Sequence, residues 1–216
     1  MVRMLLLICL WMHIVPLAVA DNTSEKDQLF ALIEKRLSLM PAVGLYKARH
    51  HKAIEDIPQE TRVLTLTVSK AVAAGLDPAL VREFFVAQIT IAKVIQYRYR
   101  AILLLNPLPD QHADLSLIRQ QLTQLSDAIV DQMAVVLKKG AITDSDWATF
   151  NQSVQVPYLE EPGKRQLFKS LKKVRLKKIS NHQLSRTGVY VSPRMAYLLT
   201  DSTQLSYAFV KHLQSS

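Results

Sequence analysis

Residues 29–47, with the sequence LFALIEKRLSLMPAVGLYK, decide how this chain is expected to fold. Leu29 and Ile33 lie four residues apart within an apolar pattern of helical period, which predicts a helix with one buried face. Pro41 lacks a backbone N–H, so it is expected to kink or interrupt that helix. Helical character then resumes and lasts to about residue 50.

Arg36 and Lys47 are the two residues of this stretch that point to chemistry. They lie eleven residues apart, which is about three turns at ~3.6 residues per turn, so both are expected on one face. A cation turned into a helical bundle is costly when nothing anionic meets it. Either internal carboxylates or an anionic ligand would have to balance the charges of Arg36 and Lys47. Taken alone, the two cations are better explained as a solvated helix face.

The rest of the chain also has a helical pattern. The full sequence contains five glycines and no run of alternating strand sequence, which predicts an all-α fold. Ser24 and Asp77 are suited to be N-caps, either Asp114 or Ser116 is suited to cap a further helix, and Gly75 is suited to follow a helix C-terminus. The expected helices cover residues 24–50 with the interruption at Pro41, 60–74, 78–105, 114–139, 143–151 and 192–213.

The first 20 residues have the features of a secretory signal peptide. Arg3 supplies a positive start, residues 4–17 are almost wholly apolar, and Ala18-Val19-Ala20 is a small-residue cleavage site. The apolar run is short for a membrane span. We therefore expect a periplasmic or secreted mature protein without an integral membrane span. The single cysteine, Cys9, lies in this segment, so the mature chain is expected to have no disulfide or thiolate metal site.

The C-terminal part is strongly basic. The formal net charge is +9, and residues 164–186 contain nine Lys or Arg and no Asp or Glu. A boundary at Pro157 predicts a signal peptide (1–20), a helical domain (21–156) and a basic C-terminal extension (157–216). The basic stretch could lie on an anionic membrane or on nucleic acid. An amphipathic helix packed on the domain, with its lysines in water, is the favoured interpretation, because an exported protein rarely meets nucleic acid.

Several residue types and intervals agree together with those of one known family. From Leu32-Ile33-Glu34-Lys35-Arg36-Leu37 through Tyr46-Lys47 and Ile54-Glu55-Asp56 to Val63-Leu64, the sequence resembles the all-α chorismate mutases. The export signal, Pro41 and the segment 114–119 resemble their secreted, gamma-type subclass. The resemblance covers roughly residues 27–135. It implies a helical bundle with long kinked helices, a homodimer, no cofactor and no metal.

The resemblance also implies an activity, the rearrangement of chorismate to prephenate, and a site for it. Arg36 and Arg119 would bind the two substrate carboxylates, while Lys47 and Gln96 would donate to the ether oxygen. Glu60 would contact the substrate hydroxyl. The full set of residues implied in substrate binding is Arg36, Lys47, Asp56, Gln59, Glu60, Gln96 and Arg119.

Two positions depart from the family pattern. Gln59 stands where the family has Arg, and Ala92 stands where Ser or Thr is usual. Arg62 is close enough in sequence to fill the place of the missing cation. Two other functions therefore remain open: a weakened relative that binds a chorismate-like dianion without turnover, and an interaction module that acts through the basic tail.

Overall fold

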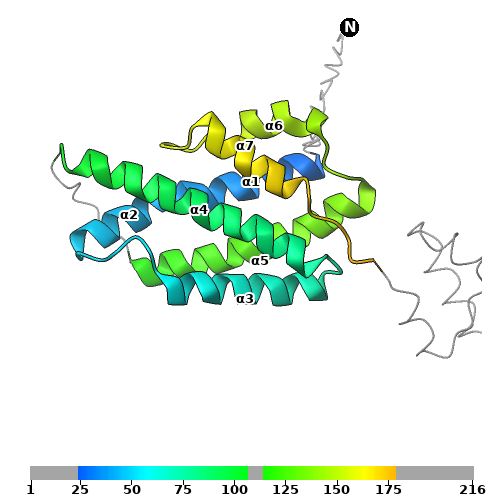
Figure 1. The fold of residues 1–216 in the computed structure, drawn as a ribbon, viewed down its shortest axis with the longest axis horizontal. Helices are drawn as coiled ribbons and strands as arrows, with labels where there is room; N and C mark the ends of the chain where they lie inside the picture. Colours follow the sequence, from blue (N-terminus) through cyan, green and yellow to red (C-terminus); the bar gives the residue numbers. More distant parts are fainter. Residues whose placement is uncertain (1–23, 107–113, 179–216) are drawn as a thin grey trace, which may run out of the picture.

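The computed structural model describes residues 24–106 and 114–178, and these form a bundle of helices (Figure 1). Over these residues the backbone pairing outside helices is one isolated antiparallel bridge, between Leu76 and Leu176. The elements are α1 (Glu25–Ser38), α2 (Met40–Arg49), α3 (Ile57–Ala73), α4 (Pro78–Leu103), α5 (Leu115–Lys139), the 3-10 turn η1 (Asp144–Asp146), α6 (Trp147–Ser153) and α7 (Glu161–Leu171). The predicted all-α fold is confirmed.

Three helix starts lie where the capping residues predict them, whereas α3 begins at Ile57, three residues before the predicted start at residue 60. The side chains of Ser24, Asp77 and Asp114 each accept a hydrogen bond from a backbone N–H in the first turn of α1, α4 and α5. Gly75 follows α3 with φ +74°, a left-handed conformation that favours glycine. The short helix expected over 143–151 is instead a 3-10 turn continued by α6 to Ser153.

The helix over residues 29–47 is interrupted, as Pro41 predicts. The break falls at Leu39, and α2 begins at Met40 with Pro41 in its first turn, where a missing N–H costs nothing. Arg36 and Lys47 therefore lie on two helices and not along one uninterrupted face. Arg36, on α1, and Lys47, on α2, nevertheless line the same pocket.

α4 is the central element of the bundle. It packs against α2, α3 and α7, while α1 packs against α5 and α6. Phe30, Phe84 and Phe150 are fully buried where these helices meet. Their burial removes apolar surface from water at roughly 25 cal/mol per Å², the main source of stability in such a bundle. In Figure 1 the long green α4 crosses the whole molecule, with α3 and α5 along one edge and α6 and α7 along the other.

α7 belongs to the same hydrophobic core. Leu167, Phe168 and Leu171 are buried in the cluster that contains the α4 phenylalanines. After α7 the backbone N–H of Asp77 donates to the carbonyl of Arg175 at 2.9 Å, which attaches the chain to the turn between α3 and α4. The interpretation of the basic stretch as a packed amphipathic helix is confirmed for α7, whereas residues 172–178 form a turn and an extended segment that carries the bridge from Leu176 to Leu76.

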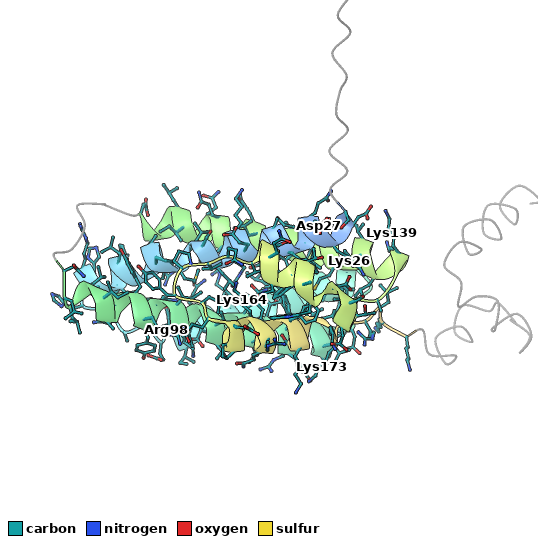
Figure 2. The ribbon with its side chains drawn as sticks, turned by 90° about the horizontal axis from the view of Figure 1, so that it is seen from above. Lys26, Asp27, Arg98, Lys139, Lys164 and Lys173 are labelled. Atoms are coloured by element: carbon teal, nitrogen blue, oxygen red, sulfur yellow. The ribbon has the colours of Figure 1, made fainter. Side chains whose placement is uncertain are left out.

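The lysines of α7 and of the segment that follows it differ in their surroundings. Lys173 projects from the surface and pairs with Glu83 at 3.3 Å, whereas Lys164 is buried and donates to the carbonyl of Asn151 (Figure 2). The division at residue 157 into separate units stays a prediction. The signal peptide and the helix expected over 192–213 lie outside the described residues. Over the described ranges, no helix is long and apolar enough to cross a membrane.

Candidate active site

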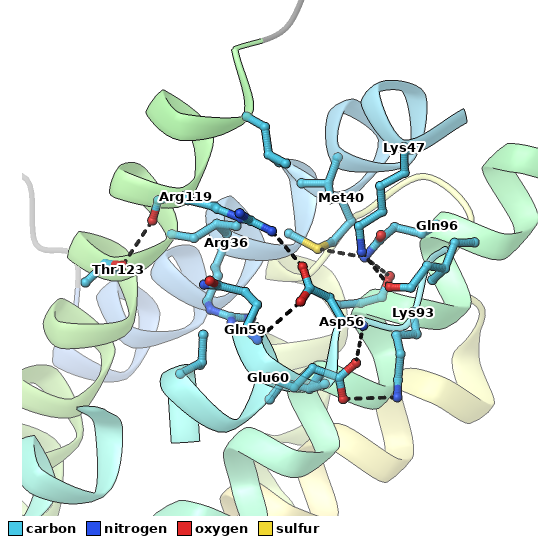
Figure 3. Close-up of a pocket in the computed structure, with 17 residues that line it drawn as sticks. Arg36, Met40, Lys47, Asp56, Gln59, Glu60, Lys93, Gln96, Arg119 and Thr123 are labelled. Atoms are coloured by element: carbon cyan, nitrogen blue, oxygen red, sulfur yellow. Dashed lines mark hydrogen bonds and ion pairs between the residues drawn. The ribbon is translucent and has the colours of Figure 1, made fainter. Parts of the chain in front are cut away.

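A pocket between α1, α2, α3, α4 and α5 collects the polar residues that the sequence singles out (Figure 3). Its empty volume is about 670 Å³, part of it open to solvent. Apolar walls come from Val43, Val63, Leu115 and Leu122. All seven predicted site residues line it: Arg36, Lys47, Asp56, Gln59, Glu60, Gln96 and Arg119. The helices bring together residues that are up to 83 positions apart in sequence, from 36 to 119.

Arg36 is a buried cation whose nearest partners are neutral. Its Nε donates to Ser126 Oγ at 3.1 Å and its Nη1 donates to Gln88 Oε1 at 3.2 Å. Ser126 passes its own hydroxyl hydrogen to the carbonyl of Leu122 at 2.7 Å, which leaves an oxygen lone pair for the guanidinium. Burial lowers the pKa of Arg36 to about 10, so the group is still charged at neutral pH. Among residues 24–106 and 114–178 no carboxylate pairs with this buried, charged guanidinium, which is therefore suited to receive an anion.

Lys47 is the second buried cation. Its ammonium donates to the backbone carbonyl of Ile54, which carries no charge. Burial lowers the pKa of Lys47, and the nearby Asp56 carboxylate offsets part of that effect. The remaining N–H groups of the ammonium are available to the pocket that it lines.

The carboxylates of the pocket lie at the start of α3. Asp56 is the N-cap of this helix and accepts from the Gln59 N–H at 3.3 Å. Its other oxygen, Oδ2, lies 2.6 Å from Nη2 of Arg119, which belongs to α5. Glu60 accepts from the Asp56 N–H at 3.3 Å, so the two acids hold each other as a helix-capping pair. Arg119 is therefore a partly exposed cation that already has a carboxylate partner.

Gln96 reaches the pocket from α4. Its Nε2 donates to the carbonyl of Ala92 at 3.2 Å, and it also contacts the sulfur of Met40 at 3.7 Å. Among the described residues its Oε1 is buried and has no hydrogen-bond partner. A thioether is a weak acceptor, so the N–H directed at Met40 can be given to a better acceptor in the pocket.

The two departures from the family pattern have different consequences here. Gln59 lies in the first turn of α3 and lines the pocket, so an uncharged amide occupies the place of the family's Arg. Ala92 also lines the pocket, where its methyl group donates nothing. Arg62 is exposed and is not among the lining residues, so it does not replace the missing cation.

Sequence reasoning missed three polar residues that shape this site. Lys93 lines the pocket and pairs with Glu60 Oε2 at 3.2 Å. Gln88 and Ser126 lie behind Arg36 and hold its guanidinium. Lys93 could have been found from its spacing, because it precedes Gln96 by three residues and therefore shares its helix face. Nothing in the sequence marks Gln88 or Ser126, since each depends on which helix packs beside α1.

The charge of the lining matches a doubly negative ligand. Four cationic side chains line the pocket in the described structure, against the two carboxylates of Asp56 and Glu60. The lining is thus net doubly positive. Within the described ranges no group of three or more His, Cys, Asp or Glu side chains is placed to hold a metal ion. The arrangement can bind a small dianion and donate hydrogen bonds to it from fixed positions.

Comparison with known proteins agrees with this geometry. The family model described as chorismate mutase type II matches residues 26–97. A monofunctional chorismate mutase from Enterobacter agglomerans is 37% identical over 149 residues, which cover 68% of this chain and 81% of that protein. A secreted chorismate mutase from Yersinia pestis is 35% identical over 163 residues, which cover 74% of this chain and 88% of that one.

Solved structures give the same result. The crystal structure of the secreted chorismate mutase from Yersinia pestis aligns with a TM-score of 0.65 at 35% identity, covering 69% of this chain and 98% of that one. A chorismate mutase from Burkholderia thailandensis aligns with a TM-score of 0.57 at 28% identity over 68% of this chain and 96% of that one. The shared sequence and fold together place this protein in the all-helical chorismate mutase family.

Proposed function

We propose that this protein converts chorismate to prephenate in the pocket described above. The observation that carries the proposal is the pair of buried cations, Arg36 and Lys47, whose partners are neutral. A buried cation without a counter-charge costs several kcal/mol of folding free energy. A site that keeps two of them is selected for an anionic ligand, and the substrate of this family carries two carboxylates.

The chemistry needs position and charge. In the rearrangement the C–O bond of the ether breaks while a C–C bond forms, and negative charge grows on the ether oxygen. No proton has to move, and no covalent bond to the protein forms. An enzyme accelerates such a step by holding the substrate in a compact chair and by placing donors where the charge develops.

The residues divide this work by their positions. Arg36 and Arg119 bind the two carboxylates from α1 and α5. Lys47, from α2, donates to the ether oxygen and a neighbouring carboxylate. Gln96, from α4, gives the ether oxygen its second hydrogen bond, exchanging the weak contact with Met40 for a strong acceptor. Glu60 is left to accept from the substrate hydroxyl.

A turnover assay tests the proposal. The mature protein is mixed with chorismate, the loss of chorismate is followed spectroscopically, and prephenate is identified as the product. We expect conversion without added metal and unchanged in EDTA. Binding of prephenate without any conversion of chorismate would instead support the second candidate function, a relative that binds a chorismate-like dianion without turnover. The replacements at Gln59 and Ala92 are the observations that favour this candidate.

The third candidate, an interaction module in the basic tail, needs a deletion that spares the core. A deletion from residue 163 would remove Leu167, Phe168 and Leu171, each of which contributes about 1.5–3 kcal/mol by burial. A deletion of residues 179–216 leaves these side chains in place. We expect this shorter protein to convert chorismate at the full rate, whereas a function that resides in the tail would be lost.

We also propose that the protein is exported and acts as a homodimer. Two of its relatives are secreted chorismate mutases, which supports a signal peptide over residues 1–20 and a periplasmic or secreted location. Mass spectrometry of the protein from the periplasm should show an N-terminus at Asp21. Light scattering of the purified protein gives the mass that tests the dimer.

A further inference from the structure

The cation that this site lacks at position 59 leaves a gap in its charge. The family resemblance expects Arg there, and this chain has Gln59. Arg62 does not fill the gap, because it is exposed and lies outside the lining. With Arg36, Lys47 and Arg119 alone, set against Asp56 and Glu60, the pocket would carry a single net positive charge. That is one too few for a dianion.

Lys93 restores the balance from another helix. It lies on α4, one turn before Gln96, and its side chain lines the pocket. We propose that Lys93 is a substrate-binding residue that contacts a carboxylate of the dianion and replaces the charge missing at Gln59. The inference rests on the proposed function, since it names a further residue of that site.

The contact between Lys93 and Glu60 explains how the lysine is held ready. Lys93 Nζ lies 3.2 Å from Glu60 Oε2, and Figure 3 shows the ammonium directed at this carboxylate. The other oxygen of Glu60 is held by the Asp56 N–H at 3.3 Å. An ammonium has three donor hydrogens, and within the described residues Glu60 accepts the one hydrogen bond given for Nζ. Two donors therefore remain for a ligand.

The exposure of Lys93 fits a role at the entrance to the pocket. Its side chain is 28% exposed, whereas Arg36 and Lys47 are almost fully buried. A lysine stem is flexible enough to follow a carboxylate as it enters, and its charge is screened less there than on the open surface. Lys93 is thus suited to capture the substrate, which should appear mainly in KM.

The experiment compares Lys93→Met with a matched control. The control, Lys70→Met, removes a lysine of α3 that has similar exposure and lies outside the pocket. Lys70 also pairs with one carboxylate, that of Asp131, at 2.8 Å. We expect Lys93→Met to lose about 10- to 100-fold in kcat/KM, mostly through KM, the scale of one charge-assisted hydrogen bond. Lys70→Met should stay within about twofold of the wild type. Unfolding temperatures of both variants show whether they are folded.

Two double variants separate direct binding from an effect through Glu60. Gln59→Arg introduced into Lys93→Met should recover most of the loss, because either cation balances the dianion. If Lys93 only positioned Glu60, then Lys93→Met would cost nothing in a Glu60→Gln background. The inference would be overturned if Lys93→Met cost nothing in the Glu60→Gln background. It would also be overturned if Gln59→Arg did not restore the activity of Lys93→Met, or if Lys93→Met alone had wild-type kinetics.

Calorimetric binding of prephenate keeps this test separate from the proposed function. If the wild-type protein did not convert chorismate, the proposed function would be refuted, but the role of Lys93 in binding would not. In that case the same variants are compared by prephenate affinity, which Lys93→Met should weaken by about tenfold or more. An unchanged affinity would overturn the role of Lys93 itself.

Discussion

The inner and outer cations of the pocket are held in opposite ways. Arg36 and Lys47 are buried, and their partners are a hydroxyl, an amide and a backbone carbonyl. Arg119 and Lys93 are partly exposed, and each is paired with a carboxylate of α3. Within the described residues neither inner cation has a carboxylate as a hydrogen-bond partner, so the inner pair gains most from the carboxylates of the substrate. The outer pair must share its donors between the protein and the substrate.

This difference predicts that the inner pair dominates catalysis. Arg36→Met keeps much of the side-chain volume and removes the charge. We expect a loss of about 10²–10³-fold in kcat/KM, the scale of a preorganised donor in a water-excluded site. The unfolding temperature should stay the same or rise, since replacing a buried ion by an apolar group is often neutral or stabilising. Kinetics and circular dichroism measured on one preparation would check both.

The positions of Gln88 and Ser126 offer a sharper version of that experiment. Ser126→Ala removes the acceptor of Arg36 Nε while leaving the charge in place. If Ser126→Ala lowers kcat/KM, but by less than Arg36→Met does, the orientation of the guanidinium contributes to catalysis. A fully active Arg36→Met variant would remove the distinction between inner and outer cations altogether.

The second prediction concerns pH and Gln96. An amide has no charge to lose, so the wild-type rate should be nearly flat from about pH 5 to 8. Gln96→Glu must be protonated to donate to the ether oxygen, so its rate should fall as pH rises through the pKa of the new carboxyl. At the alkaline end we expect a loss of about 10²-fold. A pH profile of the variant that matches the wild type would remove Gln96 from this role.

Lys47 gives a further pH signature with two opposite signs. Burial lowers its pKa, so the folded protein releases this proton at a lower pH than the ordinary lysine value of 10.5. Activity should fall on the alkaline side before that value, because the neutral amine carries no charge for the ether oxygen. Stability without ligand should rise over the same window, where the unfolded chain binds the proton and the folded chain does not. Lys47→Arg should move the fall in activity to higher pH.

Arg119 should show the weaker behaviour of an outer cation. Arg119→Met is expected to lose about tenfold in kcat/KM, mainly through KM, because Asp56 already uses part of its donors. The difference from the wild type should shrink in about 1 M salt, where the screening length is ~3 Å. A salt-independent loss as large as that of Arg36→Met would place Arg119 with the inner pair.

The smallest predicted effect is a gain. Gln59→Arg adds a cation to the edge of the pocket and should raise kcat/KM by less than about tenfold, which is below the scale of a full charge-assisted hydrogen bond. The gain is limited because Lys93 already supplies charge there, and Arg62→Ala should change nothing. A decrease in Gln59→Arg would show that the family alignment does not describe this part of the pocket.

Local sequence signals predicted most of the helices, the family resemblance predicted the lining, and contacts between helices account for what was missed. Ser24, Asp77 and Asp114 mark helix starts because capping depends on residues close in sequence. The residue set assigned by the family resemblance lines one pocket. Gln88 and Ser126 could not be predicted, because their role depends on α4 and α5 packing around Arg36. The packing of α7 on the domain was predicted, whereas its partners on α4 could not be, because these contacts join residues distant in sequence.

The most direct measurement follows chorismate with the wild type and with an Arg36→Met/Lys47→Met double variant, both in EDTA. The wild type should form prephenate at an enzymatic rate. The double variant should fall to within about tenfold of the uncatalysed rate, since it loses both the Arg36 contact to a substrate carboxylate and the Lys47 donor to the developing charge on the ether oxygen. Its unfolding temperature should not drop. A folded double variant that turns over chorismate like the wild type would contradict the assignment of catalysis to these two buried cations.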